Sequence, residues 1–412
     1  MRAPTRPLPY ALGLAVLAQM LFLHRLATPH KLVFDEVHYV PAARTLWSLA
    51  RPANIEHPLL GKALIGFGIA LFGDDSFGWR IMSTLAGTAT VMGLFAIAWL
   101  LFRNVRTAVL TALTVLAGFT LYIQARIAML DGFMAALVVG GVAAMLWAMR
   151  GTGPAVGRRW LGGAVLLGLA AGVKWVAVPY IALAALGFVI TRNPRRWPGL
   201  SLWGAAWRLG LGSVGAYLIT FLPAFFYAER PLTIATLLPF QLEIFREQTQ
   251  VLPPHTYQSA WWTWPLDIRP IWYLYERADG AQRGVLMIGN PVVMWGGLVA
   301  VAACLWGWAR DREPYAHRGA LGGVTALWLG GWGMWALIPK SLGFFYYYYL
   351  PSLWLPLAIA AAFDRYGKGK GWDEAFLALA GGLFVWFFPI ISATPLSGPG
   401  AFGHWMWFDS WR

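Results

Sequence analysis

Cysteine and charge are both scarce in this sequence of 412 residues. The single cysteine, Cys304, excludes an intrachain disulfide. Charged residues make up only 12% of the chain, whereas hydrophobic residues make up 58%. Together with a mean hydropathy of +0.56, this composition excludes a soluble domain of this length. No H-E-x-x-H motif of a zinc site and no internal repeat is present.

Repeated apolar runs of about 17–25 residues, separated by short basic segments, predict an all-α polytopic membrane protein. We place about eleven transmembrane helices at 10–27, 81–102, 107–124, 128–149, 160–177, 178–191, 209–227, 285–309, 320–338, 344–363 and 375–392. The region 160–191 is short for two full spans. Basic residues flank it on both sides, which favours an even number of crossings or a re-entrant pair.

The charge distribution predicts the orientation. The net charge is +14, and the segments assigned to the inside hold 17 basic and 5 acidic residues. Short basic loops face the cytoplasm, so we expect the N-terminus inside and the C-terminus outside. This use of the basic residues makes nucleic-acid binding the weaker interpretation. The first apolar run is interpreted as an uncleaved span, because the residues at its exit, 26–29, form a poor signal-peptide cleavage site.

Two outer segments are too long to be simple connections. They cover 28–80 and 228–284, and long loops in compact proteins are usually functional. Within the first, residues 37–50 and 59–72 have the mixed spacing of interfacial helices. We treat residues 1–412 as a single integral membrane catalytic domain.

Adjacent carboxylates, Asp35 and Glu36, follow the first span. Ionisable residues at a membrane boundary are functional candidates, and neighbouring side chains point in different directions, so the two carboxylates should have different roles. The alternative is a negatively charged helix start near Val37. His38 and His57 with these carboxylates leave a divalent metal open, although no metal is favoured.

Basic side chains gather near the outer boundary and suit a lipid phosphate, with snorkelling as the alternative. They are Lys62, Arg80, Arg126, Lys174 and Lys340. Asp131 either pairs with Arg126 or lines the same cavity.

The second outer segment is rich in aromatic residues. Trp261, Trp262 and Trp264 precede Arg269, and they suit either an aromatic belt or the binding of a sugar or peptide. The tyrosines at 346–349 are at least as typical of a belt as of a site.

These motifs together resemble the protein O-mannosyltransferases, membrane glycosyltransferases of GT-C architecture with eleven spans. The resemblance runs in order along nearly the whole chain. It covers 34–38, 57–62, 78–80, 126–131, 172–175, 261–273, 289–291, 345–351 and 407–411. The chain has no room for the large soluble domain of eukaryotic members, so it resembles the compact bacterial form. It also carries only tyrosines at 346–349, where the family commonly has a histidine.

The resemblance implies transfer of mannose, with inversion, from a polyprenyl-phosphate-mannose donor to Ser or Thr hydroxyls of exported proteins. A lipid phosphate leaves without protonation, so the reaction needs a base and nearby positive charge. Asp35 stands at the family position of the base, and Glu36 would assist it. Arg80, Arg126 and Lys174, with Lys340, would stabilise the phosphate. His57, Lys62, Asp131, the three tryptophans and Arg269 would bind substrate or support the site.

The implied location is the bacterial inner membrane, with the site on the extracytoplasmic side and no cofactor. Expected partners are the lipid donor, the protein acceptor and membrane lipids, and coupling to a secretion translocon would supply unfolded acceptors. One alternative is a lipid-donor glycosyltransferase acting on lipid A or a glycan. A transporter or flippase is the other, but it would usually show internal repeats and charges near mid-membrane.

Overall fold

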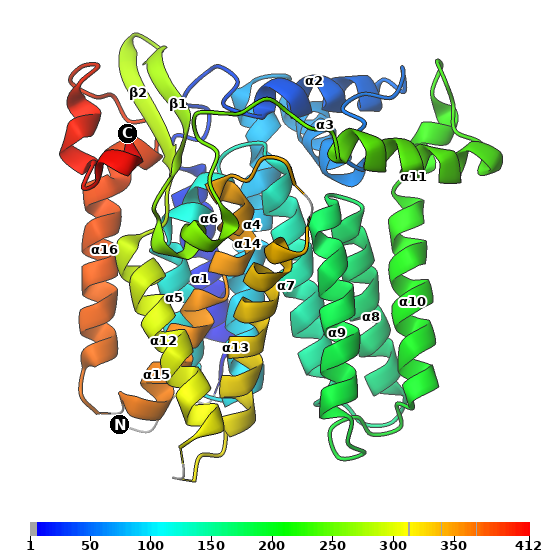
Figure 1. The fold of residues 1–412 in the computed structure, drawn as a ribbon, viewed down its shortest axis with the longest axis vertical. Coiled ribbons are helices and arrows are strands. Elements are labelled where there is room, and N and C mark those ends of the chain that lie inside the picture. Colours follow the sequence, from blue (N-terminus) through cyan, green and yellow to red (C-terminus); the bar gives the residue numbers. More distant parts are fainter. Residues whose placement is uncertain (1–5, 312–313, 339, 368) are drawn as a thin grey trace. The chain divides into compact units, whose positions relative to one another are not determined.

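The computed structural model describes residues 6–311, 314–338, 340–367 and 369–412, and these residues are mostly helical (Figure 1). They form two compact units. The first unit comprises Met1–Phe34, Leu94–Arg126 and Leu252–Arg412, and the second comprises Asp35–Gly93 and Ile127–Val251. The long helix α4 (Ser76–Phe102) contributes to both units.

The second unit contains a helical bundle and the first outer segment. Its elements are α2 (Glu36–Trp47), α3 (Leu60–Phe72), α7 (Leu130–Ala148), α8 (Pro154–Ala171), η1 (Trp175–Ala177), α9 (Val178–Thr191), α10 (Leu202–Ile219), η2 (Leu222–Phe226) and α11 (Ile234–Gln248). Helix α8 packs against α7 and α10, and α2 packs against α3. The helices at 37–50 and 59–72 expected from sequence correspond to α2 and α3, and their position at a membrane interface stays a prediction.

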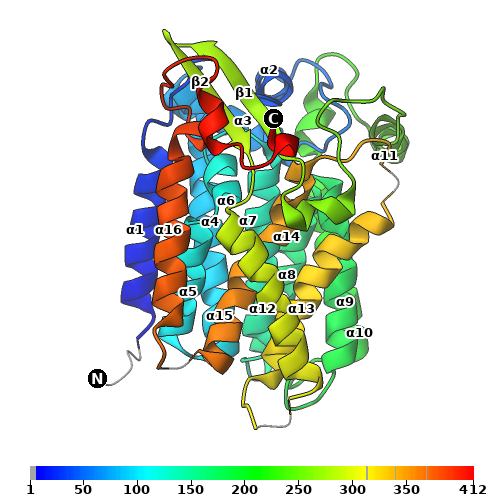
Figure 2. The same ribbon diagram turned by 60° about the vertical axis from the view of Figure 1, so that its left-hand side comes forward.

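The first unit combines helices with a hairpin. Its helices are α1 (Leu8–Leu23), α5 (Val105–Leu116), α6 (Phe119–Gln124), α12 (Pro291–Ala309), α13 (Arg318–Gly333), α14 (Tyr349–Ser352), α15 (Leu355–Tyr366) and α16 (Trp372–Ile391). Short 3-10 turns are η3 (Trp261–Leu266), η4 (Met334–Ala336), η5 (Phe345–Tyr348), η6 (Ala401–Trp405) and η7 (Asp409–Trp411). Figure 2 shows α1 and α16 beside α5, in agreement with their contacts.

The all-α expectation is wrong at one place. Strands β1 (Ile271–Ala278) and β2 (Ala281–Met287) pair antiparallel around Asp279-Gly280. Both turn residues have positive φ, 48° and 77°, as a tight two-residue hairpin turn requires. An Asp-Gly pair after a run rich in aromatic residues, 271–275, is the sequence signal that predicts such a hairpin.

Several expected spans also change their bounds. The span at 285–309 begins only at Pro291, where the Asn290 side chain accepts a hydrogen bond from Val292 N and starts α12. The expected span at 160–177 begins earlier, as α8 at Pro154, and ends at Ala171. The expected spans at 107–124 and 344–363 are each divided into shorter helices.

Within the described part of the chain, five helical stretches are long and apolar enough to cross a membrane. They are Ser76–Phe102, Leu130–Ala148, Leu202–Phe226, Pro291–Ala309 and Trp372–Ile391. Shorter apolar helices lie at Leu8–Leu23, Leu60–Phe72, Val105–Leu116 and Trp175–Thr191. The count of eleven crossings and the N-in, C-out orientation stay predictions.

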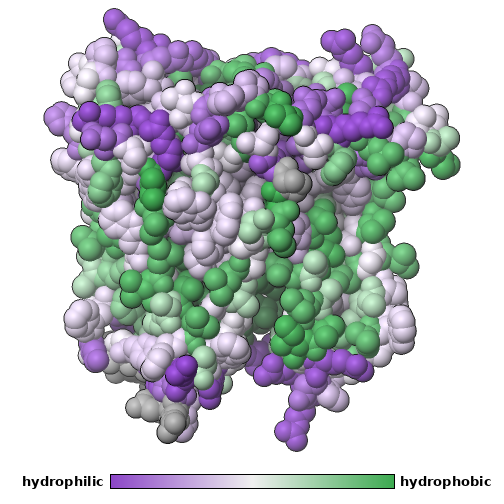
Figure 3. All heavy atoms as spheres, in the orientation of Figure 1, coloured by the Kyte–Doolittle hydropathy of each residue, from purple (hydrophilic) through white to green (hydrophobic). Residues whose placement is uncertain are grey.

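Helix α11 has two different apolar faces. Phe240 and Ile244 are buried in a cluster with Leu46, Leu59 and Phe221. On its other side, side chains at intervals of four and three residues are exposed: Ile234, Leu238, Leu242 and Phe245. Over α8, α9 and α10, Figure 3 shows hydrophobic side chains along the helices and hydrophilic ones near their ends.

The predicted orientation can be tested by cysteine labelling, because the native Cys304 is fully buried. Thr256 lies in the segment assigned to the outside and Thr152 in a loop assigned to the inside, and both are exposed. We expect an impermeant maleimide to label Thr256→Cys in intact cells and Thr152→Cys only after lysis. Labelling of Thr152→Cys in intact cells would contradict the orientation, and the wild type serves as the unlabelled control.

Candidate active site

Asp35 occupies the position just before α2. Its carbonyl accepts hydrogen bonds from the backbone N–H groups of His38 and Tyr39, both at 2.9 Å, which begins the helix. Asp35 is thus the N-cap residue of α2, but its side chain makes no capping hydrogen bond. Instead, the Tyr39 hydroxyl donates to the Asp35 carboxylate at 3.3 Å.

The half-buried Asp35 carboxyl has an unusual pKa. Burial raises this pKa to about 6, with a further rise from the carboxylate of Asp131. The ammonium of Lys174 is the largest opposing influence, followed by His38 and the hydrogen bond from Tyr39. Asp35 is therefore a stronger base than an ordinary aspartate and remains ionised at neutral pH.

Glu36 is fully buried and already paired. Arg80, which is 1% exposed, donates from Nε and from its second terminal nitrogen to the two carboxylate oxygens of Glu36, each at 2.8 Å. The backbone N–H of Ala128 also donates to Glu36, at 2.8 Å. This bidentate arrangement links the start of α2 to α4 and to the segment before α7. The two adjacent carboxylates thus have separate surroundings, as expected, whereas the phosphate role expected for Arg80 is untested.

A second buried ion pair lies in the same unit. Lys174 Nζ is 3.0 and 2.9 Å from the two carboxylate oxygens of Asp131, in the first turn of α7. The sequence left open a pair between Asp131 and Arg126; the structure gives Lys174 as the partner. Both residues of this pair also influence the pKa of Asp35, which shows that the pair shares its electrostatic surroundings.

His57 and Lys62 belong to the same segment of the second unit. The His57 ring packs edge-to-face against Tyr39, with ring centroids 5.8 Å apart. Lys62 is 1% exposed and donates to three backbone carbonyls of residues 53–57. Burial lowers the pKa of Lys62 to about 7, and the carboxylate of Glu56 opposes that change. Lys62 therefore supports the loop from inside.

Arg126 belongs to the first unit. Its guanidinium donates to the carbonyls of Phe22, His24 and Arg25 and to the Tyr122 hydroxyl. Cations favour the end of a helix, where carbonyls lack partners, and Arg126 stabilises the end of α1 in this way. A phosphate-binding role for Arg126 is untested by these contacts.

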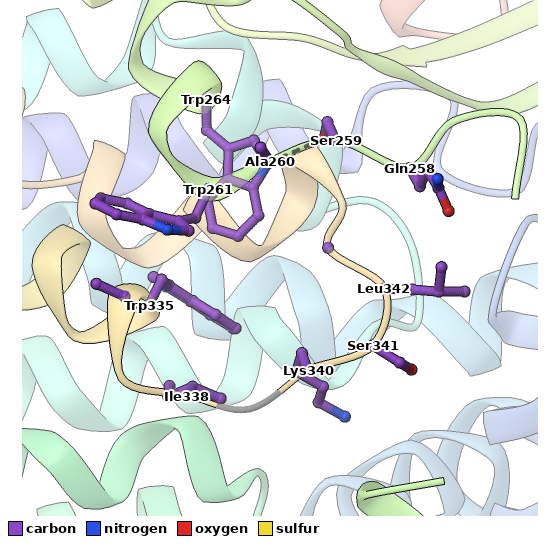
Figure 4. Close-up of a pocket in the computed structure, with 12 residues that line it drawn as sticks. Gln258, Ser259, Ala260, Trp261, Trp264, Trp335, Ile338, Lys340, Ser341 and Leu342 are labelled. Carbon is purple, nitrogen blue, oxygen red and sulfur yellow. Dashed lines mark hydrogen bonds between the residues drawn. The ribbon is translucent and has the colours of Figure 1, made fainter. Parts of the chain in front are cut away.

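The tryptophan-rich segment forms a pocket of about 500 Å³ in the first unit (Figure 4). Trp261, Trp264 and Trp335 lie on one side of it, and Lys340 lies near the opposite rim. The Trp264 indole N–H donates to the Ser259 hydroxyl at 2.9 Å. Trp262 is not among the lining residues and is exposed. Arg269 donates to the carbonyls of Ser410, Arg412 and Thr256, so it anchors the C-terminal segment.

Sequence reasoning missed Tyr39 and the Ala128 amide. Tyr39 lies four residues after Asp35, and this spacing on a helix is the signal that a side-chain contact was available. The Ala128 contact joins residues far apart in sequence and has no local signal. Among the described residues, no group of three His, Cys, Asp or Glu side chains is arranged to hold a metal ion.

Comparisons with known proteins agree along the chain. Residues 56–227 match the family described as "Dolichyl-phosphate-mannose-protein mannosyltransferase". Residues 233–411 match the "C-terminal four TMM region of protein-O-mannosyltransferase". The polyprenol-phosphate-mannose–protein mannosyltransferase of Mycobacterium tuberculosis is 26% identical over 97% of this chain and 90% of that protein. The Mycolicibacterium smegmatis protein of the same name is 26% identical over 92% and 87%, respectively.

Two solved structures share the fold. The S. cerevisiae protein O-mannosyltransferase Pmt1-Pmt2 complex bound to the sugar donor has a TM-score of 0.79 at 13% identity, covering 100% of this chain and 93% of that one. ArnT from Cupriavidus metallidurans in the apo state has a TM-score of 0.56 at 16% identity, covering 89% and 61%. The first covers both chains almost completely, so the chain shares its mostly helical, GT-C-like fold.

The buried Glu36–Arg80 pair should contribute more to the free energy of unfolding than an exposed ion pair of the same unit does. Arg80→Met leaves a buried carboxylate without its cation, and we expect a loss of about 3–5 kcal/mol in the free energy of unfolding. Arg44→Met is the control. Arg44 pairs with Asp74 at 41% and 47% side-chain exposure, and such exposed pairs contribute about 0–1 kcal/mol. Unfolding in detergent, followed by tryptophan fluorescence, measures both; equal losses would contradict the prediction.

Proposed function

The chain belongs to the protein O-mannosyltransferase family, and we propose that it transfers mannose from polyprenyl-phosphate-mannose to Ser or Thr hydroxyls of exported proteins. The full-length similarity to the mycobacterial protein mannosyltransferases is the observation that carries this proposal. The surroundings of Asp35 support it, because they provide a base beside buried cations.

We assign the base to Asp35. As the acceptor hydroxyl oxygen bonds to the anomeric carbon, its proton passes to the Asp35 carboxylate. The bond between that carbon and the phosphate oxygen breaks, and its electron pair leaves with the polyprenyl phosphate. Attack opposite to the leaving group inverts the anomeric centre. The raised pKa of Asp35, about 6, suits this role because it lies closer to neutral pH than that of an ordinary aspartate.

We assign the positive charge near the leaving phosphate to Lys174. Its ammonium is held by Asp131 at 2.9–3.0 Å. It also lowers the pKa of Asp35, so its positive charge contributes to the electrostatic potential at the base. Preorganised cations stabilise the charge that develops on a leaving phosphate. Glu36 and Arg80 would orient the start of α2, and through it the Asp35 side chain. Roles for Arg126 and Lys340 at the lipid phosphate are retained as weaker proposals.

We propose that the reaction takes place on the extracytoplasmic side of the cell membrane. The excess of basic residues in the segments assigned to the inside supports this orientation. Acceptors must then reach the outer face with accessible hydroxyls, and coupling to a secretion translocon would deliver them. The pocket bounded by Trp261 and Trp264 is a candidate surface for the acceptor chain, since aromatic and hydroxyl groups suit peptides.

The function is tested directly by incubating the purified protein with polyprenyl-phosphate-mannose and a Ser/Thr-rich peptide. Mannosylation of the peptide, detected by mass spectrometry, is the expected result. Parallel reactions with lipid A as the acceptor test the alternative glycosyltransferase. We expect transfer to survive a chelator, because the proposed step uses only protein groups; loss of transfer that added Mg²⁺ or Mn²⁺ restores would require a metal.

Asp35→Asn should remove the base without changing the size of the side chain. We expect transfer to fall by about 100- to 10,000-fold, the usual contribution of a positioned base, while the protein still inserts in the membrane. Glu229→Gln removes an exposed carboxylate from the same unit and serves as the control. Transfer by Asp35→Asn at the wild-type rate would contradict the assignment.

The pKa of Asp35 also predicts the pH dependence. The base must be ionised, so transfer should rise with pH through a midpoint of about 6 and fall as pH decreases below it. Initial rates measured between pH 5 and pH 8 at constant ionic strength provide the profile. A rate that stays constant down to pH 5 would show that no group with a raised pKa acts as the base.

A further inference from the structure

Lys62 is a fully buried cation that the proposed reaction does not use. It lies in the first turn of α3 and is 1% exposed. Its ammonium donates to the carbonyl oxygens of Ala53 at 3.0 Å, Asn54 at 2.7 Å and His57 at 2.8 Å. A lysine ammonium has three donors, and here three carbonyls receive them.

The loop around this ammonium is irregular, although Ile55 packs against the buried cluster that contains Leu46 and Leu59, and the Asn54 side chain donates to Glu56. Residues 51–58 contain no helix or strand, and Asn54 adopts a left-handed conformation with φ of 50°. Carbonyl oxygens carry partial negative charge, so three of them converge only when a donor or cation lies between them. Lys62 is therefore one of the groups that set the conformation of residues 53–57, and it is the one that holds the three converging carbonyls.

This loop contacts the residues next to the base. His57 packs edge-to-face against Tyr39 with ring centroids 5.8 Å apart, and the Tyr39 hydroxyl donates to Asp35 at 3.3 Å. A continuous series of contacts thus runs from Lys62 through the loop to His57, then to Tyr39 and Asp35.

The first turn of α3 is itself held in place. The Leu60 N–H donates to the Gly172 carbonyl at 3.0 Å, two residues before Lys174. A Cβ atom at Gly61 would lie 2.6 Å from Leu130 Cδ2 and 3.0 Å from Val173 Cγ1, so a larger residue there would require the Leu130 side chain to move. Lys62 therefore extends from a turn that is fixed against the segment carrying Lys174.

We propose that Lys62 is a positioning residue for mannosyl transfer: by holding the carbonyls of residues 53–57, it keeps His57 and Tyr39 in place and so orients the Asp35 carboxylate. Lys62 does not itself touch the donor. This inference rests on the proposed function, and the assay of the wild type separates the two. Absence of transfer by the wild type would contradict the function, whereas the variants below test Lys62 alone.

The main variant is Lys62→Met, which keeps the length of the side chain and removes its donors. We expect kcat to fall by about 10- to 100-fold, because small misplacements of a reacting group have effects of this size, with the KM for the lipid donor unchanged. Lys62→Arg keeps the charge and several donors, and the contacts of Arg126 show that a guanidinium can satisfy three carbonyls. We expect it to retain more activity than Lys62→Met. Lys370→Met, an exposed lysine in a segment assigned to the cytoplasm, is the matched control.

The pH profile distinguishes positioning from general loss of structure. The Tyr39 hydrogen bond lowers the pKa of Asp35, so its loss should move the midpoint of the acid limb to higher pH. We expect this shift in Tyr39→Phe, His57→Ala and Lys62→Met. The charged neighbours of Asp35, namely Lys174, Asp131 and His38, are unchanged in all three, and Lys62, with its pKa lowered by burial to about 7, titrates above the acid limb that is compared. His57→Ala keeps the proposal testable if Lys62→Met does not fold.

A double-mutant cycle completes the test. If Lys62 acts through Tyr39, Lys62→Met combined with Tyr39→Phe should have about the activity of Lys62→Met alone. Two results together would overturn the proposal: the losses of activity in the two single variants multiply in the double variant, and the midpoint of the pH profile is unchanged. Lys62 would then be a purely structural residue. A raised KM for the donor with unchanged kcat would also overturn it, because Lys62 would then bind the substrate.

Discussion

The ion pair between Glu36 and Arg80 is the constraint on which the candidate active site depends. Both side chains are buried, and the carboxylate also accepts the Ala128 amide, so three segments meet at one group. Removing either partner would leave a buried charge uncompensated, which strongly disfavours any rearrangement of these segments. The direction in which α2 begins is therefore fixed, and with it the place of Asp35, one residue earlier.

The other buried charges of the second unit follow from this arrangement. Lys174 pairs with Asp131, whereas the Lys62 ammonium donates its hydrogen bonds to backbone carbonyls. Asp35 forms no comparable bidentate pair among the described contacts; its partners are a tyrosine hydroxyl and more distant charges. A carboxylate with such loose partners is the one that can accept and release a proton. This pairing of the other charges agrees with the proposal that Asp35 is the base.

Local patterns predicted the parts of this structure that local physics controls. The apolar runs, the helices α2 and α3, and the different surroundings of Asp35 and Glu36 all follow from short-range spacing. The hairpin around Asp279-Gly280 also had a local signal, but the apolar residues of its second strand were assigned to the expected span at 285–309. The partners of Glu36, Asp131 and Arg126 could not be predicted, because each lies beyond the reach of a helical or strand repeat. Which cation meets which carboxylate is decided by packing rather than by spacing.

The carbonyls around Lys62 form the kind of oxygen cage that elsewhere binds a free metal ion. Here the cation is the Lys62 ammonium, which is covalently attached to the same chain. Its effective concentration at the carbonyls is therefore set by the length of the lysine side chain and not by the concentration of an ion in solution. In the proposed orientation this loop faces the cell exterior, where salt and metal concentrations change. The occupant of this cage is part of the chain itself, so the three carbonyls need no ion from the medium to fill the space between them.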